Sequence, residues 1–232
     1  MATPGVVCIY LAETLGIPPN ATHVAWRTLR ENGHATHGGR GKSAAHIDAG
    51  DASMLLAATV GKLPLKSGYE SWKRFNALPA RTGELSLPGD SDGDARQWKL
   101  DVPELRKLKV KHSFGDALEA LVAAAISGSL QSATSPRADN DTYSDRRVEV
   151  RFFGPFPQAQ ISIWKGSQLP EFRFSQSMTY SEMPSDFPEL LTYAKQARPA
   201  AEDGDMTQIT TVGTRTIMTL GQLLRVPEVA GK

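Results

Sequence analysis

The sequence predicts an α+β fold, with helices in the N-terminal part and a small antiparallel sheet in the C-terminal part. Apolar residues recur at helical spacing several times before residue 80. Three later segments alternate at period two with Pro and Gly between them, which is typical of paired strands: VEVRFF (148–153), AQISIW (159–164) and EFRFSQ (171–176). Hydrophobic residues make up 40% of the 232 residues and charged residues 22%, which is enough apolar side chain for a core.

The first two helices are predicted on either side of a Pro-rich turn. Thr3 precedes Pro4, a residue tolerated at the first helical position, and Gly16 marks the end of this helix. The stripe between them consists of Val7, Leu11 and Leu15. The connection 18–20 reads Pro-Pro-Asn, and its Asn is a good cap for a second helix over 21–32, which ends at Gly33.

Two more helices are predicted before residue 80. Asp48 with Asp51 three residues later resembles a capping pair, and it precedes an inner face of Ala52, Leu55, Leu56 and Thr59. A short helix over 67–78 follows, with Ser67 as its cap and Tyr69, Trp72 and Phe75 spaced three apart.

The composition predicts two domains joined by a linker. Residues 81–95 are rich in Gly and Pro and acidic, which is typical of a linker. The expected domains are therefore a helix-turn-helix domain over 1–80 with a basic Gly-rich arm, and an α+β domain over 96–232.

In the second domain, the segment LRKLKVK (105–111) is basic with alternating apolar residues. It fits either a second phosphate-contacting strand or the exposed face of an element that leads into a helix, and we favour the second. That helix spans 113–127, where Ser113 and Asp116 form a cap. Its stripe consists of Leu118, Leu121, Val122, Ala125 and Ile126. Residues 128–146 are Ser/Asp/Asn-rich and are expected to be irregular. Residues 209–224 fit either strand or helix.

Charge and cysteine content exclude several classes of protein. The net charge is +1, but the charge is uneven: residues 1–81 hold nine Lys/Arg against five Asp/Glu, and residues 96–112 hold six against two. Because phosphate binding is a local property, the basic N-terminal third matters more than the total. One cysteine, Cys8, allows no disulfide within the chain and no CxxC pair. No apolar run approaches a membrane span of about 20 residues, and the first residues lack the basic start of a signal peptide. We therefore expect a cytoplasmic protein.

The strongest functional pattern is a basic face on the predicted helix 21–32. Thr22, Ala25, Trp26 and Leu29 share one face and are expected to pack on neighbouring helices. His23, Arg27 and Arg30 share another, which His34 joins if the helix extends. Arginine recognises guanine O6 and N7 in the major groove, and histidine contacts phosphate or a base edge.

The loop over 34–46 adds a second set of basic residues. His37, Arg40 and Lys42 are expected to contact phosphates from a Gly-rich arm, since glycines allow close approach to a sugar-phosphate wall. Arg40 between glycines also suits a narrow minor groove. The sequence thus predicts that the helix lies in the major groove of duplex DNA, with the arm on the flanking groove or backbone.

These residues carry a resemblance to bacterial regulators. The pattern Ala12-x3-Gly16-Ile17 resembles the signature of helix-turn-helix regulators. The segment 22–33 followed by Gly39-Arg40-Gly41 is similar to the recognition helix and wing of GntR-like winged-helix regulators. The stretch over 12–43 also looks like prophage-type regulators with a basic GGRGKSA loop. The resemblance implies a transcriptional regulator whose helix enters the major groove and whose wing contacts the flanking groove.

Other motifs in the chain lack residues that a catalytic or cofactor-binding site requires. Gly41-Lys42-Ser43 lacks the earlier glycine of a phosphate-binding loop, because position 36 is Thr. His34, His37 and His46 share one loop, but no HExxH pattern or carboxylate at helical spacing accompanies them. Cys8 lies in an apolar stripe, and no GxSxG motif occurs. We therefore expect no enzyme, no cofactor and no bound metal.

The sequence-based hypothesis is a DNA-binding transcriptional regulator of phage or mobile-element type, associated with the nucleoid. A homodimer is expected, because a small DNA-binding domain gains affinity when two copies bind two half-sites. The helix 113–127 and the strand edges are the candidate dimer interfaces. The alternative is a DNA-packaging or recombination accessory protein, similar to a small-terminase ring subunit. A third possibility is an enzyme that acts on nucleic acid through the histidine loop. A generic helical domain with a charged outer face shows the same pattern without any ligand.

Overall fold

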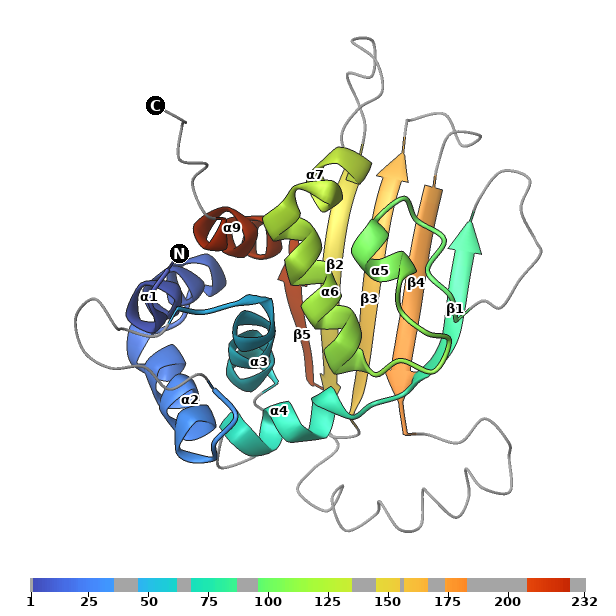
Figure 1. Cartoon of the computed structure of the whole chain (residues 1–232). Coiled ribbons are helices and arrows are strands. Elements are labelled where there is room, and N and C mark those ends of the chain that lie inside the picture. Colours follow the sequence, from blue (N-terminus) through green and yellow to red (C-terminus); the bar gives the residue numbers. More distant parts are fainter. Residues whose placement is uncertain are drawn as a thin grey trace, which may run out of the picture.

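The computed structural model describes residues 2–35, 46–61, 68–86, 96–134, 145–154, 157–166, 174–182 and 208–225. These residues form eight helices and one five-stranded antiparallel sheet, so the predicted α+β class is confirmed (Figure 1). The helices are α1 (Pro4–Leu15), α2 (Pro19–Glu31), α3 (Ala49–Val60), α4 (Gly68–Asn76), α5 (Pro103–Arg106), α6 (Phe114–Ser127), α7 (Ser129–Thr134) and α9 (Thr214–Leu224). The strands are β1 (Ala80–Ser86), β2 (Asp145–Gly154), β3 (Gln158–Gly166), β4 (Phe174–Ser181) and β5 (Gln208–Gly213).

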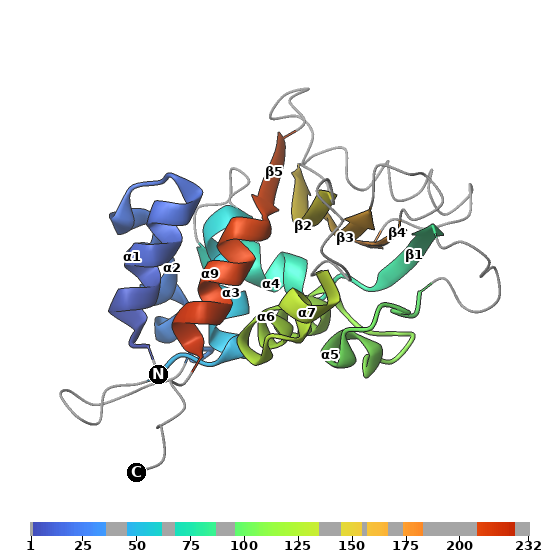
Figure 2. The ribbon, with the colours of Figure 1, turned by 90° about the horizontal axis from the view of Figure 1, so that it is seen from above.

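The sheet has the order β1-β4-β3-β2-β5. The meander β2-β3-β4 is therefore flanked by β1, which precedes it in the sequence, and by β5, which follows it. In register across its centre lie Val150, Ile161 and Met178, which are all fully buried. Helices α5, α6 and α7 lie on one side of the sheet, and α1 and α2 lie beyond β5, at the end farthest from β1 (Figure 2). The apolar face of the sheet is therefore the one against the helices.

An aromatic group joins the N-terminal helices to the sheet. Phe75 of α4, Phe114 of α6, Phe152 of β2 and Tyr180 of β4 contact one another edge to face, with ring centroids 5.1–6.4 Å apart. Such contacts add to the hydrophobic stabilisation that comes from burial. The buried residues from both sides of the predicted domain boundary belong to one continuous apolar cluster.

Part of the predicted linker is regular structure. Residues 81–86 lie in β1, which pairs with β4 along Thr82–Ser86, so the prediction of a linker over these residues is wrong. Residues 87–95 lie outside the described ranges. The sequence hides this strand because ARTGELS contains a glycine and little alternation, and its partner is far away in the chain.

Helix α6 is the centre of the helical layer. Ser113 and Asp116 form the predicted capping box, and Gly128 ends the helix in the left-handed conformation at φ 87°. The residues of its predicted stripe are buried apart from Ile126, which is half-buried. This apolar face packs inside the chain, on α3 and α9 among others, so it is not available as the dimer interface that the sequence suggested.

Several boundaries differ from the sequence-based predictions. The third strand of the meander spans Phe174–Ser181, and residues 171–173 of the predicted strand lie outside the described ranges. The strand thus extends past the predicted end at 176, and its Met178 and Tyr180 are buried. The segment 129–134, expected to be irregular, forms α7. Residues 209–224, which fit either strand or helix, contain both: β5 ends at Gly213, and α9 begins at the next residue.

Candidate nucleic-acid interface on helix α2

The two N-terminal helices meet at a turn set by a glycine and two prolines. Gly16 adopts a left-handed conformation at φ 66°, and the Ile17 amide donates to the Ala12 carbonyl at 3.0 Å, which closes α1. Pro18 occupies the cap position and Pro19 the first turn of α2. The predicted succession of a first helix, a Pro-rich turn and a second helix is present, although α2 starts at Pro19 and Asn20 lies inside it rather than capping it.

The inner face of α2 is held against α1 by hydrogen bonds as well as by packing. Thr22, Ala25, Trp26 and Leu29 are the buried residues of this helix, as the sequence predicts. The hydroxyl of Thr22 lies 2.9 Å from the Cys8 carbonyl of α1. The Cys8 thiol donates back to the Thr22 carbonyl at 3.7 Å, and burial raises the pKa of this thiol to about 11. These contacts fix the rotation of α2 about its own axis.

The opposite face of α2 is exposed and carries the three predicted DNA-contacting residues. His23, Arg27 and Arg30 all lie on this face. The Arg27 Nε donates to the Glu31 carboxylate at 2.7 Å, with side chains that are 70% and 52% exposed. This hydrogen bond and charge raise the pKa of the Arg27 guanidinium. The pair is an open surface contact that a phosphate or a base edge can replace.

One further residue of this face was missed in the sequence. The Val24 side chain is 46% exposed and lies at the edge of this face, about 60° around the helix axis from Arg27. An exposed apolar side chain beside basic ones is suited to contact with a thymine methyl group in the major groove. Its position three residues before Arg27 was visible in the sequence, but it was not assigned to either face.

His34 does not belong to the basic face. Helix α2 ends at Glu31, and Gly33 turns the chain with φ 76°. The imidazole of His34 then packs on α4, with ring centroids 5.2 Å from Tyr69 and 4.6 Å from Trp72. Extension of the helix would have been needed to bring His34 beside Arg30.

The predicted arm lies between two anchored points. His37, Arg40 and Lys42 fall in 36–45, which lies outside the described residues, so the structure does not place them. Ala35 and Ile47 on either side are 3% and 5% exposed. The Ile47 amide donates to the Ala2 carbonyl at 3.1 Å, so Ile47 lies beside the start of α1.

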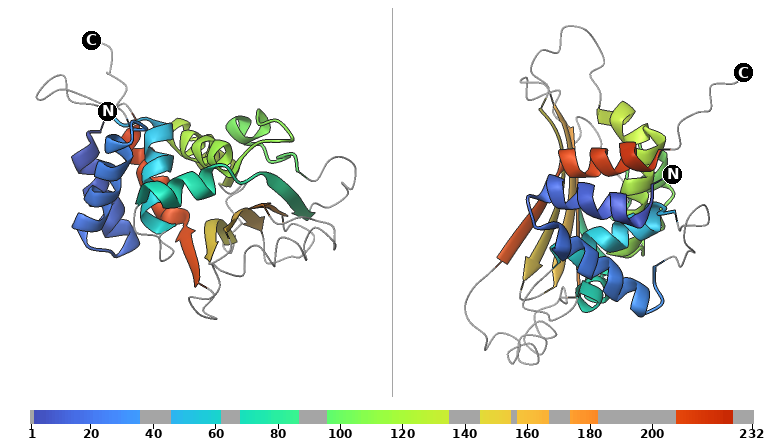
Figure 3. Two further views of the ribbon diagram at one scale, coloured as in Figure 1. Left: turned by 90° about the horizontal axis from the view of Figure 1, so that it is seen from below. Right: turned by 90° about the vertical axis from the view of Figure 1, so that its left-hand side faces the viewer.

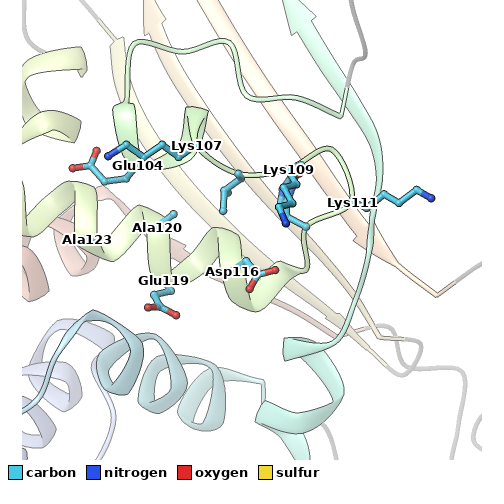
Figure 4. Close-up of a pocket in the computed structure, with 10 residues that line it drawn as sticks. Glu104, Lys107, Lys109, Lys111, Asp116, Glu119, Ala120 and Ala123 are labelled. Atoms are coloured by element: carbon cyan, nitrogen blue, oxygen red, sulfur yellow. The ribbon is translucent and has the colours of Figure 1, made fainter.

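A separate cleft of about 520 Å³ lies between α6 and the segment 104–112 (Figure 4). Its walls carry Lys107, Lys109 and Lys111 together with Glu104, Asp116 and Glu119. Figure 4 shows that the Lys111 side chain extends away from α6. Three positive and three negative side chains line the cleft, so its local charge does not favour a polyanion.

The carboxylates of this cleft differ in their environments. Burial opposes ionisation of Glu104, but hydrogen bonds from the Ser127 and Ser129 hydroxyls at 2.6 and 2.5 Å outweigh it and lower its pKa. For Glu119, burial and then the charges of Asp48 and Asp116 raise the pKa. Glu104 therefore links α5 to the end of α6 through charge-assisted hydrogen bonds.

The buried imidazole of His112 lies beneath this cleft and links it to the sheet. Its Nδ1 lies 2.7 Å from the Lys109 carbonyl and its Nε2 lies 2.9 Å from the Tyr180 hydroxyl. A carbonyl only accepts, so Nδ1 carries the proton and Nε2 accepts from Tyr180. Burial lowers the pKa of His112, and burial raises the pKa of Tyr180. The imidazole is thus held neutral.

We expect the fold to lose stability as the pH falls from 7.5 to 5.5. The unfolded chain protonates His112 near its ordinary pKa of 6.5, whereas the folded chain keeps it neutral to lower pH. Acid therefore favours the unfolded state through this group. Urea midpoints at the two pH values measure the effect, and His112→Asn, which keeps a donor for the Lys109 carbonyl, should show a smaller pH dependence. An equal dependence in both proteins would refute the role of His112.

Neither a metal centre nor a membrane segment occurs in the described ranges. No group of three His, Cys, Asp or Glu side chains there is arranged to hold an ion. None of the helices in these ranges combines the length and the apolar character that crossing a membrane requires. No family model, no curated protein and no solved structure matches the chain.

Proposed function

We propose that the protein binds duplex DNA sequence-selectively through the exposed face of α2 and acts as a transcriptional regulator of phage or mobile-element type. The observation that supports this most directly is the division of α2 into a fully packed inner face and an exposed face of His23, Val24, Arg27 and Arg30. Location in the cytoplasm, associated with the nucleoid, belongs to the same proposal.

The dimensions of α2 suit the major groove. A helix of 13 residues is about 20 Å long, and the groove is about 12 Å wide, enough for one helix. From His23 to Arg30 the exposed face covers about 10 Å, the height of about three base pairs. Arg27 or Arg30 bonds a guanine edge, Val24 meets a thymine methyl group, and His23 contacts phosphate or a base edge.

The arm residues complete the proposed interface. Arg40 and Lys42, with His37, supply phosphate or minor-groove contacts next to the groove that α2 occupies. Both anchors of the arm lie close to the helix pair, since His34 packs on α4 and Ile47 bonds to Ala2. Because α2 alone reads few base pairs, two copies are needed for useful affinity, which is why a homodimer is part of the proposal.

The proposal is tested by fluorescence-anisotropy titration of random duplex DNA at two salt concentrations. We expect salt-sensitive binding, because each neutralised phosphate contributes a slope of about −0.9 in log K against log salt. A quadruple alanine variant of Arg27, Arg30, Arg40 and Lys42 should lose this salt-sensitive binding to duplex DNA.

A second quadruple variant is the matched control. Alanine at Arg106, Lys107, Lys109 and Lys111 also removes four positive charges, but from the segment at α5, which lies over the sheet away from α2 (Figure 1). It should bind like the wild type. No binding by the wild type even at low salt, or equal losses in both variants, would contradict a DNA site on α2.

The alternative, a DNA-packaging or recombination accessory protein, uses the same face of α2 with weaker choice of sequence. Oligomer size separates the two: light scattering should show a dimer for a regulator and a ring for a packaging subunit.

A further inference from the structure

The outer face of α1 is apolar where a surface helix is normally polar. Its twelve residues, PGVVCIYLAETL, include one charged side chain, Glu13. Val7, Cys8, Leu11 and Ala12 are buried against the chain, while Val6, Ile9 and Tyr10 on the other side are 40%, 44% and 44% exposed. We call Val6, Ile9 and Tyr10 the α1 stripe. A helix that is apolar on all sides is ordinarily covered on all sides.

The exposed apolar side chains are concentrated in this place. Five large apolar side chains are exposed in the described part of the chain, and three of them form the α1 stripe. The other two, Val24 and Ile209, stand singly on α2 and β5, as is normal for a protein surface. The neighbouring helix α2 shows the ordinary pattern, with four charged or imidazole side chains on its outer face. Helix α1 therefore presents three apolar side chains and one charged side chain, Glu13, on its outer face.

We propose that the α1 stripe is covered by the α1 stripe of a second copy of this chain, with the two helices antiparallel about a two-fold axis. The need for two half-sites rests on the proposed function, but the apolar stripe is independent of it. With the axis between Ile9 and Tyr10, each Ile9 lies against Tyr10 of the partner subunit. Glu13 then lies against the partner's Val6.

The charges favour this direction of pairing. The first turn of α1 contains no acidic residue, so the positive end of its helix dipole lacks a counter-charge. In the antiparallel pair, Glu13 of each copy supplies that charge to the other copy. A parallel pair would instead place the two Glu13 carboxylates side by side. Gly5, where an added Cβ would meet nothing within 4 Å, leaves room at the edge of the stripe for close approach.

Such an interface sets the oligomeric state. It is isologous, because the same patch serves both subunits, so it closes at two copies and does not form a ring. Helix α2 follows α1 after a short turn, so pairing of α1 also fixes the two α2 helices relative to each other. The DNA site expected for this assembly is a two-fold symmetric pair of half-sites.

The experiment is sedimentation equilibrium of the full chain over a range of concentrations. We expect the wild type to dimerise and Ile9→Lys to raise the dimer dissociation constant about tenfold or more, because two lysines enter an apolar contact. Ile209→Lys is the matched control, since Ile209 is 55% exposed on β5, and it should dimerise like the wild type. A wild type that stays monomeric, a ring, or equal weakening by both lysines would overturn the proposal.

Cross-linking tests the direction of the helices. In the antiparallel pair the two copies of residue 9 lie next to the axis, whereas the two copies of residue 13 are about 10 Å apart along it, at 1.5 Å per residue. Oxidation should therefore cross-link Ile9→Cys to itself and leave Glu13→Cys unlinked. Parallel helices would bring both equivalent pairs side by side, so cross-linking of Glu13→Cys as well would show parallel pairing and would refute the arrangement.

DNA titration of the same proteins separates this proposal from the proposed function. Ile9→Lys should keep salt-sensitive binding to random duplex and lose about tenfold or more of its affinity for a two-half-site duplex. A monomeric wild type that still binds DNA would refute the dimer alone. A dimeric wild type that binds no DNA would refute the DNA-binding function alone.

Discussion

An Arg27→Ala variant is expected to bind its preferred duplex about 5- to 150-fold more weakly than the wild type, while binding to random duplex changes less. The reason is geometric: the guanidinium lies on the exposed face of α2, three residues after Val24, where it can reach both acceptors of a guanine. Loss of a base contact leaves that guanine without its partner, so the effect depends on sequence.

Lys42→Ala is the comparison that separates base contacts from phosphate contacts. It should weaken binding to all duplexes similarly and reduce the salt slope by about 1, as loss of one phosphate contact does. Glu31→Gln provides a second comparison, since removal of the carboxylate paired with Arg27 should tighten binding, most clearly at low salt. If neither Arg27→Ala nor Lys42→Ala changes binding, α2 is not the recognition helix.

A Gly221→Ala variant is expected to lose about 1–3 kcal/mol of stability, the usual cost of overpacking. Glycine to alanine normally stabilises a helix interior, so the expected sign is the opposite of the helix propensity. At this position an added Cβ would lie 2.5 Å from the backbone of Ala125, where α9 crosses α6. Backbone cannot rotate away as the end of a side chain can, so the two helices must separate.

Urea unfolding of the purified variant measures this effect. Gln222→Ala is the control, because it places alanine at the next position of α9, where the side chain is exposed. It should leave the midpoint nearly unchanged. A midpoint for Gly221→Ala equal to or above that of the wild type would show that α6 and α9 do not approach as closely as described.

Most helices could be predicted because their signals are local in sequence. The Asp48 side chain accepts from the Asp51 amide, and Ser113 and Asp116 form a reciprocal cap, so both starts follow from residues three apart. Strand β1 could not be predicted in this way. It is an edge strand held by pairing with β4, about a hundred residues later, and its own sequence shows little alternation.

The candidate site was predicted in part. Helical periodicity alone separates the buried Thr22 and Trp26 from the exposed His23 and Arg27. The ion pair between Arg27 and Glu31 has the i, i+4 spacing that favours such pairs on a helix, so it too could be predicted from the sequence. His34 was expected on the basic face only if the helix extended, and the end of the helix that Gly33 indicated places it against α4 instead.

The packing of α9 on α1 has a consequence for synthesis of the protein. The first and last helices of the described chain lie side by side, and α9 also covers α6 (Figure 3). While the ribosome makes the chain in order, α1 and α6 emerge long before residues 214–224 do. The surfaces of α1 and α6 that contact α9 therefore stay uncovered until residues 214–224 have been synthesised, and the core closes only after that point. Until α9 emerges, chaperones that bind nascent apolar segments can bind the uncovered surfaces of α1 and α6.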